Sequence, residues 1–168
     1  MSEISEKDWI IYCDGNNMQL KSFAGLHKNS YNIILCPSGK EAIEQFRVNI
    51  GKIKTVLLDI NLPDMSGLDV FDEIKRMSYD IPVILTTADQ SEANELSVWR
   101  KYRPFSYILK NTSAAPEFIK ATLSTAIDGY NQRLAVERFR ESETISTVTQ
   151  KLHKQHEKQI KELQKAAL

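Results

Sequence analysis

Five short runs of apolar residues mark the first two thirds of the chain, at residues 9–13, 33–36, 56–58, 81–85 and 107–109. Within each run the apolar residues are continuous rather than alternating with polar ones, and many are β-branched. Strands that are covered on both faces, as in a parallel sheet, have this pattern. The sequence therefore predicts five buried strands.

The segments between these runs have the apolar spacing of amphipathic helices. Ser38 and Glu41 have the spacing of a capping box and precede the apolar residues Ala42 and Phe46, which marks the start of one such helix. Strand and helix patterns alternate five times. This order predicts an α/β fold with a parallel sheet and right-handed crossovers.

The composition excludes several classes of protein. The chain has 168 residues, 22 of them basic and 22 acidic, with a formal net charge of +0. We therefore expect no electrostatic drive toward nucleic acid or an anionic membrane, and no basic helix-turn-helix pattern is present. A flavodoxin-like enzyme or nucleotide binder has little support, because neither a Walker pattern nor GxGxxG occurs.

The sequence contains no pattern of membrane insertion or export. No apolar run approaches the roughly 20 residues that cross a bilayer. Residues 1–8 are too polar for a signal peptide, and the chain is expected to be cytoplasmic.

Polar residues stand where the predicted strands end. Asp14 follows the first strand and Asp59 ends the third, while Thr86 and Thr87 end the fourth and Lys110 ends the fifth. In open α/β sheets, ligands bind at the carboxyl edge of the strands. The sequence therefore predicts one site that gathers these side chains.

This combination of residues suits phosphoryl transfer. Two or three carboxylate or carbonyl oxygens can hold Mg²⁺ together with a phosphate oxygen. The metal and Lys110 would neutralise the incoming phosphoryl group while the Asp59 carboxylate attacks phosphorus. Taken singly, Asp14 could instead be a helix cap, Thr87 a strand-end residue and Lys110 a solvated surface charge.

The composition changes after Gly129. Residues 130–168 contain no Gly or Pro and are dense in Lys, Glu and Gln, which predicts that the fifth helix continues past the domain. Apolar residues recur every three or four positions around Leu134 and again around Leu152, as in a two-helix seam. The repeat is interrupted between Leu134 and Ile145, so a dimeric coiled coil and a single solvated helix both remain open.

Three stretches of this sequence resemble the receiver domain of two-component response regulators. They are residues 57–67 (LLDINLPDMSG), 82–88 (PVILTTA) and 107–110 (YILK), and the resemblance runs from about residue 9 to residue 127. It implies a flavodoxin-like, doubly wound five-stranded parallel sheet of order 2-1-3-4-5. The expected organisation is an N-terminal extension at 1–8, a receiver domain at 9–129 and a helical extension at 130–168 that serves as a coiled-coil linker or dimerisation segment.

The resemblance also implies roles for individual residues. Asp59 looks like the phosphoacceptor, Thr87 the hydroxyl that closes on the phosphoryl group, Lys110 its cationic partner and Tyr107 the aromatic switch residue. The cofactor implied is Mg²⁺, and the following ligands are expected for it: Asp14, Asp59 and the backbone carbonyl of Asn61.

Two positions depart from the family pattern. Receivers usually have two adjacent acids after the first strand, but Gly15 stands at the second place. That acid is commonly the direct metal ligand, so its absence bears on Mg²⁺ affinity, for which Asp14 or Asn16 could compensate. Asn111 follows Lys110 where the family generally has proline, so the loop that holds Lys110 could differ in shape.

The function implied is a phosphoryl-accepting switch rather than an enzyme, with at most weak autophosphatase activity. A histidine kinase or phosphotransfer protein would donate to Asp59. Thr87 and Tyr107 would relay the change to the face formed by the fourth helix, fifth strand and fifth helix, and to a homodimer through that face and the C-terminal helix. An output domain could follow the helix. The alternative is a degenerate receiver that acts as a dimerisation or docking module without phosphorylation.

Overall fold

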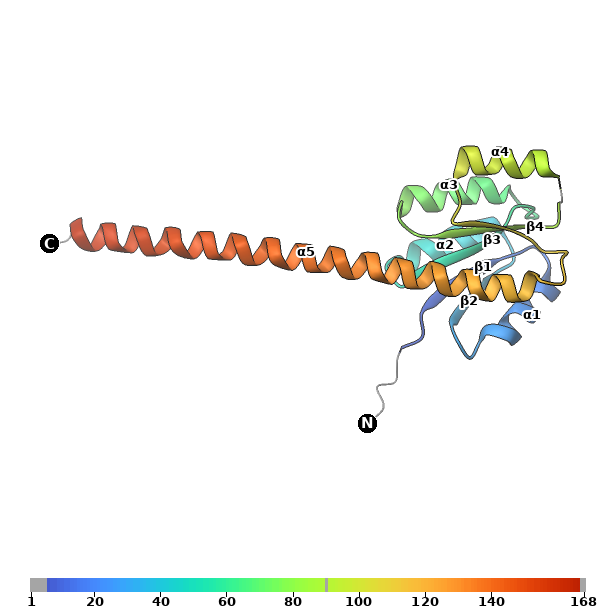
Figure 1. Ribbon diagram of the computed structural model, residues 1–168, viewed down its shortest axis with the longest axis horizontal. Coiled ribbons are helices and arrows are strands. Elements are labelled where there is room, and N and C mark those ends of the chain that lie inside the picture. Colours follow the sequence, from blue (N-terminus) through green and yellow to red (C-terminus); the bar gives the residue numbers. More distant parts are fainter. Residues whose placement is uncertain (1–5, 90, 167–168) are drawn as a thin grey trace. The chain divides into compact units, whose positions relative to one another are not determined.

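The five predicted strands form one parallel sheet in the order β2-β1-β3-β4-β5 (Figure 1). This computed structural model describes residues 6–89 and 91–166. The strands are β1 (Trp9–Cys13), β2 (Asn32–Cys36), β3 (Ile53–Asp59), β4 (Val83–Thr87) and β5 (Ser106–Leu109). The predicted fold class and strand order are confirmed.

Within residues 6–89 and 91–166, five helices alternate with the strands. They are α1 (Asn17–His27), α2 (Gly39–Val48), α3 (Gly67–Met77), α4 (Glu92–Tyr102) and α5 (Ala115–Ala166). The first part of α5 and α1 cover one face of the sheet, and α2, α3 and α4 cover the other (Figure 1). Among the described residues, none of these helices combines the length and hydrophobicity that a bilayer-spanning segment requires.

Short polar side chains fix where the helices begin. The Ser38 side chain accepts a hydrogen bond from the Glu41 backbone N–H at 3.3 Å, as its position in the sequence predicts. Asn16, rather than Asp14, caps α1, because its side chain accepts from the Met18 N–H at 2.9 Å. Asp14 is therefore left for another role.

The core continues along both faces of the central strands. Ile10, Leu57 and Ile84 face α1 and α5 within one cluster of buried side chains that includes Leu123. Apolar burial of this kind stabilises the sheet by roughly 1.5–3 kcal/mol for each large side chain. It also aligns the strands, so that Cys13 lies beside Leu58, and Asp59 beside Thr86.

The chain divides into two compact units, Met1–Tyr130 and Asn131–Leu168. In the second unit, α5 continues as a helix to Ala166, and we call residues 131–166 the helical arm. Between residues 131 and 165, every side chain except those of Asn131 and Leu134 is exposed. The arm therefore buries almost no apolar surface within this chain.

Gly67 lies where the loop after β3 turns into α3. A Cβ atom at this position would overlap the Asp59 carbonyl oxygen and would lie 2.8 Å from the Ile60 Cα. The Gly67 N–H also donates to the Ile60 carbonyl at 2.8 Å. The absence of a side chain at Gly67 thus allows the loop to fold tightly behind Asp59.

We predict that Gly67→Ala lowers the free energy of unfolding by about 1–3 kcal/mol, because backbone atoms cannot move aside cheaply. Gly25→Ala in α1 is the matched control, since its Cβ would meet nothing within 4 Å. It should raise stability by about 0.5–1 kcal/mol, as alanine favours helix. Urea denaturation of both variants checks this, and equal effects would contradict the role assigned to Gly67.

Candidate functional site

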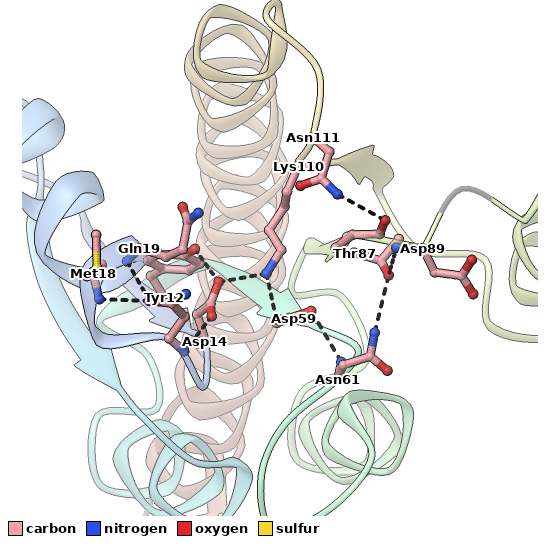
Figure 2. Close-up of polar contacts among 12 residues, drawn as sticks. Tyr12, Asp14, Met18, Gln19, Asp59, Asn61, Thr87, Asp89, Lys110 and Asn111 are labelled. Atoms are coloured by element: carbon pink, nitrogen blue, oxygen red, sulfur yellow. Dashed lines mark hydrogen bonds and ion pairs between the residues drawn. The ribbon is translucent and has the colours of Figure 1, made fainter.

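The carboxyl edge of the sheet brings three charged side chains into direct contact (Figure 2). Asp59 is the last residue of β3, Asp14 follows β1, and Lys110 follows β5. The Lys110 Nζ lies 2.6 Å from Asp59 Oδ2 and 2.9 Å from Asp14 Oδ2. Residues that are far apart in the sequence thus form one ion cluster.

Both carboxylates are almost removed from solvent, with Asp14 1% exposed and Asp59 5% exposed. Each is held by further hydrogen bonds. Asp14 Oδ1 accepts from the Asn16 N–H at 2.8 Å, and Asp59 Oδ1 accepts from the Asn61 N–H at 3.2 Å. With both carboxylates ionised, the two acids and one lysine carry a net charge of −1, so the cluster can then accept another cation.

Burial and ion pairing act in opposite directions on these groups. Burial raises the pKa of Asp59 above its usual range, and the hydrogen bond from Lys110 only partly offsets this. Burial disfavours the charge of Lys110, but its hydrogen bonds to Asp59 and Asp14 outweigh that effect and raise its pKa. Lys110 therefore remains cationic near neutral pH.

Thr87 and Tyr107 lie beside this cluster rather than in it. The Thr87 Oγ1 accepts hydrogen bonds from the Asp89 N–H at 3.1 Å and the Asn61 Nδ2 at 3.5 Å. With Tyr107, Thr87 lines a cavity of about 210 Å³ to which Asn61 also contributes. Among the described residues, the buried Thr86 hydroxyl has no hydrogen-bond partner.

The ion cluster lies in an open cleft of about 820 Å³. Asp14, Asp59, Asn61, Lys110 and Asn111 are among the residues that line it. The cleft is thus large enough for a phosphoryl group together with the water around a metal ion.

The donor set suits a weakly held Mg²⁺. No group of three or more His, Cys, Asp or Glu side chains that could hold a metal occurs within the described ranges. Asp14 and Asp59 supply two carboxylates, however, and Mg²⁺ is typically held by one or two carboxylates with water and phosphate oxygens. Asp64, a third acid that lines the cleft, instead accepts from the Gly39 N–H at 2.8 Å and the Lys40 N–H at 3.0 Å at the start of α2.

Gly15 lies in the cleft wall at the place of the missing acid. A Cβ atom there would be 3.0 Å from Pro63 Cδ, so a larger residue would require the ring to shift slightly. Asn111 donates from its side-chain amide to the Ala88 carbonyl at 3.2 Å, which ties the loop of Lys110 to the end of β4. No peptide bond in residues 6–89 or 91–166 is cis.

Tyr12 is a site residue that the sequence pattern does not reveal. Its hydroxyl donates to Asp14 Oδ2 at 2.7 Å from within β1 (Figure 2). In the sequence Tyr12 belongs to an apolar strand and is interpreted as a core residue. The available signal is that Tyr12 precedes Asp14 by two residues, because residues two apart on a strand point to the same face.

Comparison with known proteins shows the family to which the chain belongs. A family model for the response regulator receiver domain matches residues 10–122. Response regulator RR06 of Streptococcus pneumoniae is 31% identical over 107 residues, which are 60% of this chain and 48% of RR06. Transcriptional regulatory protein ZraR of Escherichia coli is 31% identical over 97 residues, which are 58% of this chain and 21% of ZraR. The chain thus matches less than half of each relative's length.

The fold is also that of a solved receiver structure. Response regulator protein TrrA of Thermotoga maritima, determined in complex with Mg²⁺ and BeF, is 27% identical, with a TM-score of 0.60. The match covers 71% of this chain and 98% of that chain. Since the family model covers more than half of the sequence, the chain belongs to the receiver domain family of two-component response regulators.

Proposed function

We propose that this receiver is a phosphoryl-accepting switch in which Asp59 is the acceptor. Receiver domains are signalling phosphoacceptors that histidine kinases phosphorylate, and they typically bind Mg²⁺. The observation that carries the proposal is the Lys110 ammonium, 2.6 Å from Asp59 and 2.9 Å from Asp14 at the floor of an open cleft. A histidine kinase or phosphotransfer protein is the proposed donor.

The transfer follows from the groups in the cleft. An Asp59 carboxylate oxygen attacks phosphorus, the bond from phosphorus to the donor imidazole nitrogen breaks, and the donor histidine leaves with that electron pair. Lys110 then shares its N–H groups between Asp14 and the new phosphoryl oxygens. Asp14, Asp59 and the Asn61 carbonyl would hold Mg²⁺, whose positive charge would stabilise the transferring group.

The side chains beside the cluster provide the proposed relay. Thr87 accepts from the Asn61 amide, and Asn61 follows Asp59 by two residues. A phosphoryl group on Asp59 offers the Thr87 hydroxyl a strong acceptor. Tyr107 lines the same cavity as Thr87, so it would sense a movement of Thr87 toward the phosphoryl group. The change would reach the face of α4, β5 and α5. Such a switch needs two states that phosphate biases, rather than a new fold.

A phosphorylation-independent docking module is the alternative, and Gly15 is the observation that favours it. The cleft has one acid fewer than its family, and Asp64, which also lines it, accepts from the Gly39 and Lys40 N–H groups, so Asp14 and Asp59 are the carboxylates left for Mg²⁺ among the described lining residues. The intact ion cluster of Asp14, Asp59 and Lys110 favours the switch, because a docking module has no need to bury two carboxylates against a lysine.

The helical arm is the proposed route to a second copy of this chain and to an output domain. Ile145, Leu152 and Leu163 lie on one face of the helix and are 66%, 52% and 70% exposed. Arg138 and Glu141 occupy the same face where the apolar repeat is interrupted. In an in-register parallel pair, each of these residues would face its own copy, and Arg138 would also reach Glu141 of the other helix in the next layer, so a two-helix seam would be weaker here than at its apolar layers.

We predict that incubation with Mg²⁺ and acetyl phosphate adds one phosphoryl group, detected by intact-mass spectrometry. Asp59→Asn should abolish the adduct, because the nucleophilic oxygen is lost. Beryllofluoride should also change tryptophan fluorescence, since Trp99 lies on α4 and is 37% exposed. If no Asp59-dependent adduct forms and beryllofluoride leaves the tryptophan fluorescence unchanged, the docking module becomes the better interpretation.

The raised pKa of Asp59 predicts a pH dependence of stability. Asp59 loses its proton at a higher pH in the folded state than in the unfolded state. Between these two pKa values the folded state binds more protons, so the free energy of unfolding falls as pH rises. The stability of Asp59→Asn minus that of the wild type should therefore grow as pH rises above about 4, the usual pKa of an unfolded aspartate. Urea denaturation at a series of pH values measures this difference.

Asp64→Asn is a control of opposite sign. Slight burial opposes the charge of Asp64, but hydrogen bonds from the Lys40 and Gly39 N–H groups outweigh it and lower its pKa. Its carboxylate therefore stabilises the fold above its unfolded pKa. This variant should lose stability relative to the wild type as pH rises, and a parallel trend in both variants would refute the assignment.

We predict that the full chain is a dimer in light scattering and that truncation after Leu134 yields a monomer. Ile145→Asp should also favour the monomer, because it places a charge within the seam. Thr147→Asp is the matched control, since residue 147 points to the opposite side of the helix. If the oligomeric state is the same before and after truncation, the proposed seam is refuted.

A further inference from the structure

We propose that Tyr12 is a positioning residue that holds the Asp14 carboxylate in the orientation in which it binds Mg²⁺. The inference rests on the proposed metal-binding role of Asp14. Tyr12 is behind Asp14 and does not line the cleft, so it would act through the acid rather than on metal or phosphate directly.

The contact is short and lies away from solvent. The Tyr12 Oη is 2.7 Å from Asp14 Oδ2, and the two residues are 4% and 1% exposed. A hydrogen bond to a carboxylate is shorter and stronger than one between neutral groups. Burial raises the pKa of Tyr12, and the hydrogen bond to Asp14 raises it further, so the hydroxyl keeps its proton and acts as the donor.

The Tyr12 ring has little freedom to turn away. It packs against Phe23 of α1 with ring centroids 4.4 Å apart, and Phe23 in turn packs against His27 at 4.5 Å. Tyr12 also belongs to the buried cluster on this face of the sheet. The hydroxyl is therefore fixed by packing, as a group that orients a ligand must be.

This support matters because Asp14 has no acidic neighbour at position 15. Its carboxylate accepts from Tyr12, from the Asn16 N–H at 2.8 Å and from Lys110 at 2.9 Å. When Lys110 turns toward a phosphoryl group, its bond to Asp14 weakens. Tyr12 and the Asn16 N–H then keep the acid in place, so that it remains available to the metal.

Tyr12→Phe removes the hydroxyl and keeps the ring that packs against Phe23. Loss of a group that orients a metal ligand typically costs 10–100-fold in affinity. We expect about a 10-fold weaker affinity for Mg²⁺, measured by its competition with Mn²⁺ in electron paramagnetic resonance. Tyr31→Phe is the matched control, because Tyr31 lies at the far end of the same aromatic row, with its ring centroid 6.4 Å from that of His27.

A kinetic measurement separates positioning from a general loss of structure. With acetyl phosphate as the donor, Tyr12→Phe should require about 10-fold more Mg²⁺ for half-maximal phosphorylation. The rate at saturating Mg²⁺ should stay near that of the wild type. A lower rate at every Mg²⁺ concentration, without a change in Mn²⁺ or Mg²⁺ affinity, would show that Tyr12 is only part of the core and would overturn the proposal.

The remaining outcomes distinguish this inference from the proposed function. Equal metal affinity of the wild type and Tyr12→Phe overturns the role of Tyr12 and leaves the phosphoacceptor role of Asp59 standing. Weaker metal binding in Tyr12→Phe, without phosphorylation of either protein, supports Tyr12 and refutes the switch. Absence of metal binding by the wild type overturns the role of Tyr12 and the metal ligands proposed for the switch.

Discussion

The rest of this structure depends on one ammonium group that is shared by two buried carboxylates. Burying a charge without a partner costs on the order of several kcal/mol, and the contacts of Lys110 with both Asp14 and Asp59 offset much of that cost at the sheet edge. The three residues come from the ends of β1, β3 and β5. The sheet order and the alignment of strand ends are therefore conditions for the site, and the site is what makes that edge polar.

Much of this arrangement could be predicted from the sequence, because two simple patterns define it. Continuous apolar runs identify strands that are covered on both faces, and polar residues directly after such runs must reach the same edge of a parallel sheet. Asp59 and Lys110 could be placed in this way. The bounds of β4 were less accurate: the apolar run begins at Ile81, but the strand begins at Val83. Pro82 has no N–H to donate to a neighbouring strand, and its carbonyl accepts from the Val56 N–H instead.

Other parts of the site could not be predicted, because hydrophobic patterning does not describe hydrogen bonding. Tyr12 counts as an apolar strand residue, although its hydroxyl contacts Asp14. The position of Thr87 at a strand end does not show that its hydroxyl accepts from Asn61 and Asp89 rather than from the charged cluster. These details depend on side-chain rotamers and on which donor lies within hydrogen-bond distance of each acceptor. The order of apolar and polar residues along the chain contains neither kind of information.

The close approach at Gly67 has a mechanical consequence for any signal that begins at Asp59. The backbone there is held on two sides: the Asp59 carbonyl lies against Gly67, and the next residue, Ile60, donates its N–H to Thr86 at 3.0 Å. Strain in the Asp59 side chain therefore cannot be relieved by sliding the main chain toward α3. On the other side of Asp59, the side chains of Asn61 and Thr87 border the cavity beside Tyr107, where there is room for side chains to move. Gly67 has no reactive group of its own, but its close contact makes the α3 side of the site rigid and leaves movement to the side chains next to the cavity.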